Sequence, residues 1–353
     1  MTQDTPTMTT DLTPFEIDVL EQPDALRALA HAASEVGLDE LARRPWERVI
    51  LTGMGSSHFA GIPTWQILAH AGTAAWAIDA GQLLDTPGLI TPRSLVIATS
   101  QSGASGEIVE LIDRLGDGRI PKAHLVGITS DPESPLATAA DLFLPLHSGS
   151  EATVSTKSYL NSLAVHRQII GAFTGEHRDI IREGILEVAD SVERTLATTQ
   201  VATLAGQALN FSHYRLATVG KRDHAATALF AGLITKESSK VAIEGHIGGQ
   251  FRHGPFELAG PGLTVFIYGA YRSDTDLSIA HLADDLVATG SSVVLIGDLR
   301  VEGATTLGDR QTSPLGGLAT GAVMAELFAI ELAKANGVTP GAFAFGSKIT
   351  TAL

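Results

Sequence analysis

The order of short apolar strands and amphipathic helices is the feature that most restricts the fold of this chain. Apolar runs at 48–52 and 94–99 are each followed by a polar turn and then by a helical pattern. This alternation is typical of parallel strands joined by crossover helices. The same order begins again at 215–219, after two long helical stretches. The sequence therefore predicts an α/β protein in which a doubly wound parallel sheet is built twice.

The individual elements follow from local periodicity and from turn residues. The predicted strands are 48–52, 74–77, 94–99, 124–129, 142–146, 215–219, 263–268 and 292–296. The predicted helices are 15–33, 60–71, 107–115, 157–171, 176–200, 225–241, 278–289 and 319–335. These elements divide the chain into a polar tail (1–14), a first domain with linker helices (15–200), a second domain (201–340) and a C-terminal tail (341–353).

Composition and charge exclude several classes of function. The chain has 353 residues, of which 44% are hydrophobic and 18% charged, as in a globular protein able to bury two cores. The net charge of −15 and the lack of any run of Lys and Arg argue against a nucleic-acid partner. A small anionic ligand remains possible, since backbone amides at a helix N-terminus can bind one.

The absence of cysteine excludes disulfides, cysteine metal sites and a cysteine nucleophile. The segment 1–11 has neither the basic nor the apolar region of a signal peptide. No apolar run approaches the ~18 residues that span a membrane. We therefore expect a cytoplasmic protein without a membrane partner.

A polar loop rich in serine follows the strand at 94–99. Ser100, Gln101, Ser102 and Ser105 place four hydrogen-bonding side chains immediately before a predicted helix. One serine at this position is an ordinary helix cap, but three serines and a glutamine exceed what capping requires. Because free amides and a partial positive charge lie at a helix N-terminus, the loop predicts a phosphate site.

Two further loops follow predicted strands. The segment 53–58, Gly-Met-Gly-Ser-Ser-His, allows close backbone approach, but it lacks the third glycine of a dinucleotide-binding loop. Its His58 can be interpreted either as a sugar-facing side chain or as a partly buried structural histidine. The segment 151–157 is a third cluster of small hydroxyl residues before a helix.

The stretch 235–258 combines a carboxylate with a histidine. Glu237 lies on a predicted helix, and His253 follows sixteen residues later in a turn bounded by Gly and Pro. A carboxylate that moves a proton and an imidazole that acts on a hydroxyl are what aldose–ketose chemistry requires. The competing interpretation is a helix, a loop and a turn with incidental charges.

Lys348, near the C-terminus, also has two interpretations. A lysine in such a tail is usually solvated, whereas a desolvated lysine can form a Schiff base with a carbonyl. His246 and His253 are seven residues apart, which is not a usual zinc spacing, and we expect no metal site.

Four ordered motifs resemble the SIS (sugar isomerase) family. They are Gly-x-Gly-Ser-Ser at 53–57, Ser-Gln-Ser-Gly-x-Ser at 100–105, Ser-Thr-Lys-Ser-Tyr at 155–159, and Lys-Glu leading to His-Gly-Pro between 236 and 255. These motifs are most similar to those of the isomerase half of glucosamine-6-phosphate synthase and of stand-alone glucosamine-6-phosphate deaminases. The resemblance covers residues 15–353.

The resemblance implies roles for individual residues. Glu237 would move a proton between C1 and C2, His253 would open the sugar ring from across a homodimer interface, and Lys348 would bind the ketose carbonyl. The phosphate would be held by Ser57, Ser100, Gln101, Ser102 and Ser105, with Gly55, Ser56 and Ser155 near the sugar. No cofactor is required.

The sequence also departs from the synthase. Phe230 and Ile234 stand where the synthase has Glu and Lys on the catalytic helix, which predicts a more apolar active-site wall. About fourteen residues precede the similar region, and no cysteine is present to attack glutamine. Glutamine-dependent synthesis is therefore not expected of this chain by itself.

Three functions remain after this comparison. The leading hypothesis is an isomerase or deaminase for an amino-hexose phosphate such as glucosamine-6-phosphate, working by carboxylate-mediated proton transfer with release of ammonia. A second is an aldose–ketose isomerase, or a deglycase for a fructosamine phosphate. The third is a non-catalytic phosphosugar sensor, which would not need Glu237 and His253.

Overall fold

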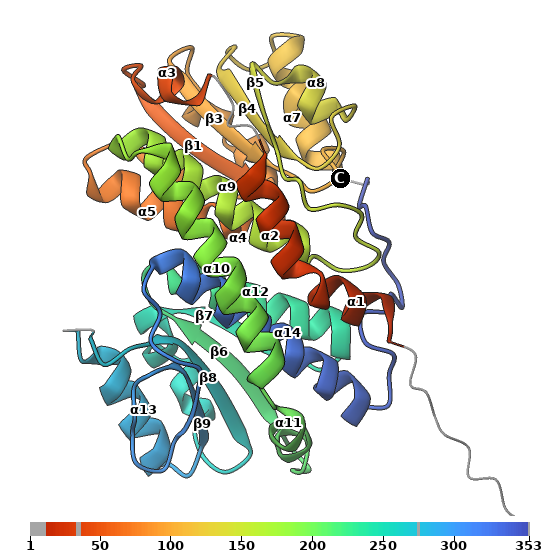
Figure 1. Ribbon diagram of the computed structural model, residues 1–353, viewed down its shortest axis with the longest axis vertical. Helices are drawn as coiled ribbons and strands as arrows, with labels where there is room; N and C mark the ends of the chain where they lie inside the picture. The colour runs from red at the N-terminus through yellow and green to blue at the C-terminus, as the bar shows by residue number, and fades with distance from the viewer. Residues whose placement is uncertain (1–11, 33–36, 274–275, 352–353) are drawn as a thin grey trace, which may run out of the picture.

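The computed structural model describes residues 12–32, 37–273 and 276–351. It contains two five-stranded sheets, with strand orders β2-β1-β3-β4-β5 and β10-β9-β8-β6-β7 (Figure 1). Every strand pairing is parallel. The prediction of an α/β fold with two similar parallel sheets is therefore confirmed.

The first sheet and its helices occupy the upper part of Figure 1. The strands are β1 (Arg48–Gly53), β2 (Ala75–Ala77), β3 (Ser94–Thr99), β4 (His124–Thr129) and β5 (Leu142–Pro145). The helices are α1 (Pro14–Leu20), α2 (Gln22–His31), α3 (Leu38–Ala42), α4 (Ser56–Ala60), α5 (Ile62–His70), α6 (Ala80–Asp85), α7 (Gly106–Gly116), α8 (Pro135–Ala139), α9 (Lys157–Thr174) and α10 (Arg178–Thr198), with a 3-10 turn η1 (Pro87–Leu89).

The second sheet lies below it. The strands are β6 (Arg215–Gly220), β7 (Glu244–Ile247), β8 (Leu263–Ala270), β9 (Ser292–Gly297) and β10 (Thr305–Leu307). The helices are α11 (Ala202–Ala208), α12 (His224–Ser239), α13 (Ser278–Ala288) and α14 (Pro314–Ala335), with 3-10 turns η2 (Gly248–Arg252) and η3 (Pro255–Leu258).

The two halves share one continuous core. Along β1, Val49 and Leu51 belong to this central core, whereas Ile50 faces a separate cluster on the outer side of the sheet. Along β9 the same alternation places Val294 in the central core and Val293 in an outer cluster. Strand side chains point alternately to opposite faces, so each buried sheet contributes one face to the shared core.

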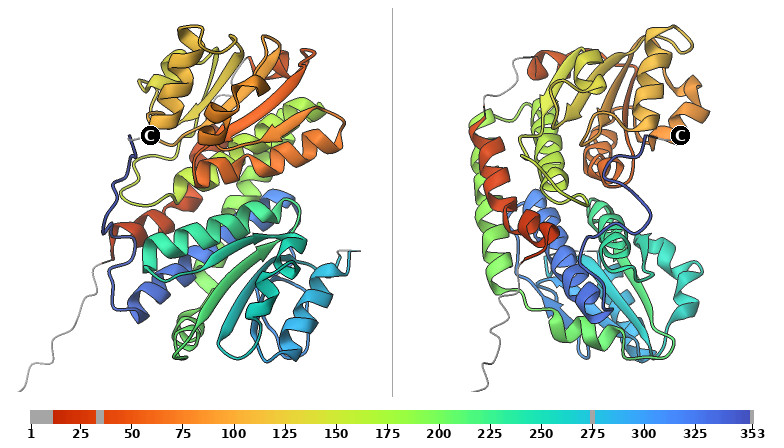
Figure 2. Two further views of the ribbon diagram at one scale, coloured as in Figure 1. Left: turned by 180° about the vertical axis from the view of Figure 1, so that it is seen from behind. Right: turned by 90° about the vertical axis from the view of Figure 1, so that its right-hand side faces the viewer.

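Helices α2 and α10 hold the halves together. In Figure 1 and in the right view of Figure 2, α10 extends along the molecule past the junction between the two sheets. Helix α10 packs against both α2 and α14. The predicted domain limits at 200/201 and 340/341 stay a prediction, because the core runs through both halves.

Helix α14 corrects two expectations. It begins at Pro314, five residues before the predicted start, because Gly316 and Gly317 resemble a loop in the sequence. Ser313 caps the helix by accepting a hydrogen bond from the Gly316 amide at 3.1 Å. A side chain at Gly317 would collide with Tyr271 and His224, so glycine permits the close packing of this first turn.

The second correction concerns membrane-spanning length. We expected no apolar run long enough, yet α14 has 22 residues and a mean hydropathy of 1.5 over its most apolar window. Of that window, 89% is buried inside the protein, where α14 packs against α9, α10, α11 and α12. The helix is apolar because it lies in the core, so its composition is weak evidence for a membrane span.

A buried carboxylate connects α14 to α2. Glu326 is 0% exposed, and the Gln22 side-chain amide donates to both of its oxygens at 2.9 and 2.8 Å. Burial raises the pKa of Glu326 well above 4.5, and Glu151 raises it further, while the Gln22 hydrogen bond opposes the shift. The folded protein therefore holds a proton on Glu326 that the unfolded chain releases.

This raised pKa predicts a pH-dependent loss of stability. As the pH rises above about 4.5, the unfolded state loses the proton first, and folding is destabilised by about 1.4 kcal/mol per pH unit until the folded state also deprotonates. Glu326→Gln removes this contribution. Urea unfolding across pH 4–8 should therefore show the variant gaining stability relative to wild type as the pH rises. Glu187→Gln, which changes an exposed carboxylate, serves as a control. If the stability of Glu326→Gln depends on pH in the same way as that of the wild type, the raised pKa of Glu326 is contradicted.

Candidate active site

A cavity of about 300 Å³ lies where the first sheet, α12 and the C-terminal segment meet. It contains every predicted site residue except His253. These residues are Gly55, Ser56, Ser57, Ser100, Gln101, Ser102, Ser105, Ser155, Glu237 and Lys348. The rest of the lining is Met54, Thr99, Glu107, Thr153, Val154, Leu233, Phe343, Ser347, Ile349 and Thr350.

The loop after β1 depends on two glycines. A Cβ on Gly53 would lie 2.6 Å from the Thr99 carbonyl oxygen, so only glycine allows β1 and β3 to end this close together. Gly55 has φ 53°, a conformation that other residues rarely adopt. The turn leads directly into α4, and it places Ser56 and Ser57 at the cavity.

The serine loop after β3 has an internal framework. The Ser100 hydroxyl accepts a hydrogen bond from the Gly103 amide at 3.1 Å, and the Ser102 hydroxyl accepts one from the Ala104 amide at 3.2 Å. Ser105 occupies the N-cap position of α7 without making a side-chain cap. Its hydroxyl lies 3.4 Å from that of Ser100. The loop therefore presents hydroxyls and the start of an 11-residue helix to the cavity, as an anion site requires.

A buried histidine supports the end of β3. His166 on α9 lies between the hydroxyls of Thr64 at 3.0 Å and Thr99 at 3.2 Å. Burial lowers the pKa of His166 to about 3, so its ring is neutral at physiological pH. Thr99 is itself part of the cavity lining, and the contact fixes its side chain.

Glu237 comes from the second half of the chain. It lies on α12, which packs against α4 beside the first loop. Burial raises the pKa of Glu237 above 4.5, and the positive charges of Lys240, Lys348 and Lys236 partly oppose this shift. A carboxylate with a raised pKa beside polar ligand groups is suited to accept and return a proton near neutral pH.

The predicted apolar wall at Phe230 and Ile234 is wrong. Both side chains are only 1% exposed and belong to the central core, where Phe230 stacks on Tyr159 at 3.8 Å between ring centroids. The lining residues of α12 are Glu237 and, one turn earlier, Leu233. Phe230 and Ile234, which align with the Glu and Lys of the synthase, are therefore part of the core and not of the cavity surface.

Lys348 is not solvated. Its ammonium group donates to Glu151 at 2.7 Å, and its side chain is 24% exposed. Glu151 is a residue that the sequence reasoning missed, although it opens the hydroxyl cluster at 151–157. A charged residue among small polar ones could have indicated its importance, but its partner, Lys348, lies 197 positions away in the sequence.

His253 lies outside the cavity. It follows η2 and is exposed, and it is not among the lining residues. His58 does not line the cavity either. Burial lowers the pKa of His58, and its ring packs edge-on against Phe59, which favours the structural interpretation. Within the described ranges, no group of three or more His, Asp or Glu side chains is arranged to hold a metal ion.

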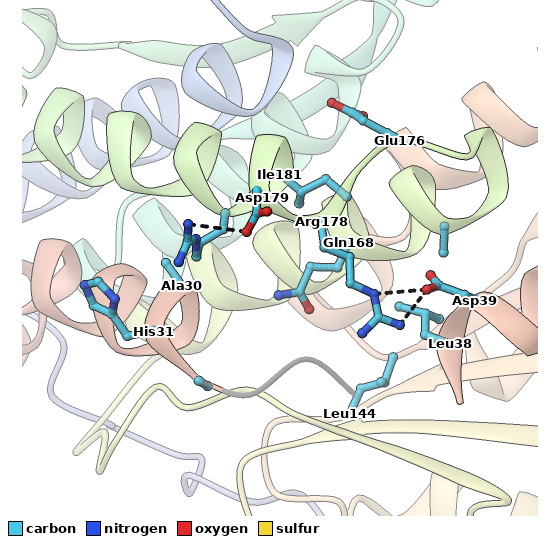
Figure 3. A pocket seen from close by; sticks show the side chains of 13 residues that line it. Ala30, His31, Leu38, Asp39, Leu144, Gln168, Glu176, Arg178, Asp179 and Ile181 are labelled. Carbon is cyan, nitrogen blue, oxygen red and sulfur yellow. Dashed lines mark hydrogen bonds and ion pairs between the residues drawn. The ribbon is translucent and has the colours of Figure 1, made fainter. Parts of the chain in front are cut away.

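A second cavity, of about 240 Å³, borders α2, α3 and α10 (Figure 3). Its charged side chains form ion pairs: Arg178 contacts Asp39 at 2.6 Å, Arg182 contacts Asp179 at 3.3 Å, and Glu176 contacts Arg167 outside the lining at 2.6 Å. None of the predicted site residues lies there. The cavity between the halves is therefore the candidate active site.

Residues 44–172 match the family model of the SIS domain. This region includes β1 to β5, the serine loop and the cluster at 151–157. The SIS domain therefore supplies the polar wall of the cavity, while Glu237 and Lys348 come from outside the matched region.

Curated relatives extend the similarity beyond the SIS domain. The glutamine–fructose-6-phosphate aminotransferase of Methanocaldococcus jannaschii is 26% identical over 297 residues, which cover 82% of this chain and 26% of that protein. The chain spans about a quarter to a half of the length of the first curated relatives it matches.

Solved structures share the whole fold. The C-terminal domain of glucosamine-fructose-6-phosphate aminotransferase from Francisella tularensis has a TM-score of 0.77 at 17% identity, covering 94% of this chain and 98% of that one. A glucosamine-6-phosphate deaminase from Thermotoga maritima gives 0.73 at 20% identity (96% and 99%), and a tagatose-6-phosphate ketose/aldose isomerase from Escherichia coli gives 0.78 at 21% (96% and 96%). The chain thus has the fold of tandem SIS subdomains.

The electrostatic surroundings of Glu237 predict a pH effect. If Glu237 accepts a proton during turnover, kcat/KM falls on the acid side with an apparent pKa above 4.5. Lys240→Gln removes the positive charge that most lowers the pKa of Glu237, so the acid side of the kcat/KM profile should move to higher pH. The shift should be roughly a few tenths of a pH unit, because solvent screens the exposed Lys240 charge. The pH profile of kcat/KM measures it, with the distant Lys122→Gln as control. A shift to lower pH would contradict the arrangement.

Proposed function

We propose that this protein is a phosphosugar isomerase of the deaminase type, which converts an amino-hexose phosphate such as glucosamine-6-phosphate into a ketose phosphate and ammonia. One observation carries the proposal: a single cavity contains the serine loop before α7, the carboxylate of Glu237 and the ammonium group of Lys348. Sequence similarity to aminotransferases that act on fructose-6-phosphate supports the same substrate class.

The serine loop is proposed to bind the phosphate. Ser100, Gln101, Ser102 and Ser105 offer side-chain donors. The α7 amides that follow Gly106 add to them, since the Gly106 amide already donates to Thr350. Lys348 is the cationic side chain in the described lining, and it compensates part of the charge that the ligand brings. An acidic protein can bind an anion in this way because the local donors, and not the net charge, determine the interaction.

Glu237 is proposed to carry out the proton transfer. In the open-chain aldose, Glu237 removes the proton from C2, the electron pair forms the C1–C2 double bond of an enolamine, and the C1 carbonyl oxygen takes up a proton from water. Glu237 then returns a proton to C1, and the nitrogen gives a proton back to water, which leaves an imine at C2. Exchange of the imine nitrogen for the oxygen of water at C2 then gives the ketose phosphate and ammonia. A carboxylate with a raised pKa suits this cycle, because it must both take and return the proton.

Lys348 is proposed to act at C2. After losing a proton, its amine can attack the imine carbon and expel ammonia, and water then releases the ketose from the lysine imine. Its position in the cavity lining makes this contact possible. His253 is exposed and lies outside the cavity, so its proposed role in ring opening depends on a second copy of the chain in a homodimer.

The direct test is turnover of glucosamine-6-phosphate, with ammonia and fructose-6-phosphate measured in the same sample. We expect the two products in equal amounts from the wild type and a loss of at least about a hundredfold in Glu237→Gln, since general base catalysis contributes this much. Glu244→Gln, an exposed carboxylate on β7, is the control. Interconversion of an aldose and a ketose phosphate without ammonia would replace deamination by isomerisation, and binding without turnover would replace the enzyme by a sensor.

A second prediction tests the phosphate site. Ser105→Ala should raise KM for glucosamine-6-phosphate by roughly ten- to a hundredfold, as expected for a lost hydrogen bond to a charged group, with a smaller change in kcat. Ser130→Ala is a matched control, because Ser130 follows the neighbouring strand β4 but does not line the cavity. Equal KM values for the two variants would remove Ser105 from the phosphate site.

A further inference from the structure

The carboxylate of Glu151 accepts five hydrogen bonds. One oxygen accepts from the Thr156 amide at 2.7 Å, the Thr156 hydroxyl at 2.9 Å and the Ser158 amide at 3.0 Å. The other accepts from the Ser158 hydroxyl at 2.8 Å and from the Lys348 ammonium group at 2.7 Å. The side chain of Glu151 is 0% exposed, so its charge is compensated inside the protein and not by water.

Lys348 is the cation that compensates this charge. The other lysine nearby in sequence, Lys157, contacts Asp18 at 3.0 Å and Glu21 at 2.5 Å, and so serves a different carboxylate pair. A buried charge that loses its partner is strongly destabilised. The ion pair between Glu151 and Lys348 therefore favours the docked position of the segment that carries Lys348.

That segment, 341–351, has no helix or strand. It leaves α14, crosses toward the first sheet and ends beside α7 (Figures 1 and 2). Near its two ends, the Gly341 amide donates to the Ser238 carbonyl at 3.4 Å and the Thr350 carbonyl accepts from the Gly106 amide at 3.1 Å. Between them Phe345 is fully exposed, so apolar burial contributes little to holding this part in place.

We propose that Glu151 is a positioning residue that holds the C-terminal segment over the cavity through Lys348. The segment contributes Phe343, Ser347 and Lys348 among others to the cavity lining, so the site is complete only while the ion pair is formed. The effect on the segment is independent of the substrate. The effect on turnover rests on the proposed function.

An alternative role for Glu151 is purely local. It accepts from the amides of Thr156 and Ser158 at the start of α9, and it acts there as a helix cap. The two roles differ in what Lys348 does: a cap acts without Lys348, whereas positioning requires it. Lys348→Met separates them, because it removes the ion pair but leaves both amide hydrogen bonds of the cap, while Ser158→Ala is the control that removes one hydrogen bond to Glu151 and leaves the ion pair in place.

The test is limited proteolysis of the full-length chain without ligand, using chymotrypsin and following cleavage after Phe343 and Phe345 by mass spectrometry. Cleavage of a locally opened segment follows the population of the open form. Glu151→Gln and Lys348→Met should each raise this rate by about tenfold or more, as expected when a hydrogen bond between charged groups is lost. The double variant should be no faster than either single variant, and Ser158→Ala should resemble wild type.

Two results would overturn the proposal. One is an unchanged cleavage rate in both Glu151→Gln and Lys348→Met. The other is an additive double variant, which would mean that the two residues act separately. If Glu151→Gln folds poorly, Lys348→Met and Glu151→Asp still decide the question. Lys348→Met breaks the ion pair by changing its partly exposed partner. Glu151→Asp keeps the negative charge and should therefore be cleaved more slowly than Glu151→Gln.

Kinetics then separate this proposal from the proposed function. With glucosamine-6-phosphate, Glu151→Gln should lower kcat by at least about tenfold, and the double variant should be no slower than Lys348→Met. If wild type shows no turnover, the function is wrong, but the proteolysis result still stands. If wild type turns over and Glu151→Gln has the wild-type kcat, the positioning role is wrong while the function stands.

Discussion

The parallel pairing of β1 and β3 is the constraint on which the site depends. In this register Gly53 pairs with Thr99, so both strands end at the same level. The loops that follow, 54–58 and 100–105, are far apart in the sequence and yet face one cavity. The glycine at position 53 makes this possible, because any side chain there would collide with the Thr99 backbone.

The second half of the chain supplies the remaining walls of the cavity that the first sheet lines. Helix α12 packs on α4 and on α5, and at the start of α5 Ile62 meets Ala225 and Ala226 in a small apolar cluster between the halves. Small residues on α12 let the helix approach closely, and Glu237 consequently reaches the edge of the first sheet. The C-terminal segment crosses the same junction and adds Lys348. Three parts of the chain thus meet at one edge, and the cavity lining extends beyond the residues that match the SIS domain.

The fold and most of the site were predictable from local patterns. Strands such as β3 and β4 are short, apolar and bounded by polar turns, and their predicted limits agree with the structure. The edge strands β7 and β10 were missed, because short strands with mixed polarity lack a clear period. The cavity residues before α7 were predictable because several hydroxyl groups exceed the needs of a cap.

The errors concern contacts between distant residues. The expectation that Phe230 and Ile234 line the cavity came from comparison with the synthase and from helical spacing, but Phe230 stacks on Tyr159 and both residues are buried in the core. Glu151 was missed because its role appears only through Lys348, which tertiary structure brings to it. Burial has the same effect on Glu237 and Glu326: it raises the pKa of both, which composition does not reveal.

The central claim is that Glu237 transfers a proton between adjacent carbons of a sugar phosphate bound in this cavity. The most direct measurement is proton NMR of fructose-6-phosphate incubated with the enzyme and ammonium in D2O. We predict that solvent deuterium enters the C1 position with wild type, because the protonated carboxyl group of Glu237 exchanges with solvent before it returns a proton to carbon, and that Glu237→Gln abolishes this incorporation. Incorporation at the same rate with Glu237→Gln would contradict the claim.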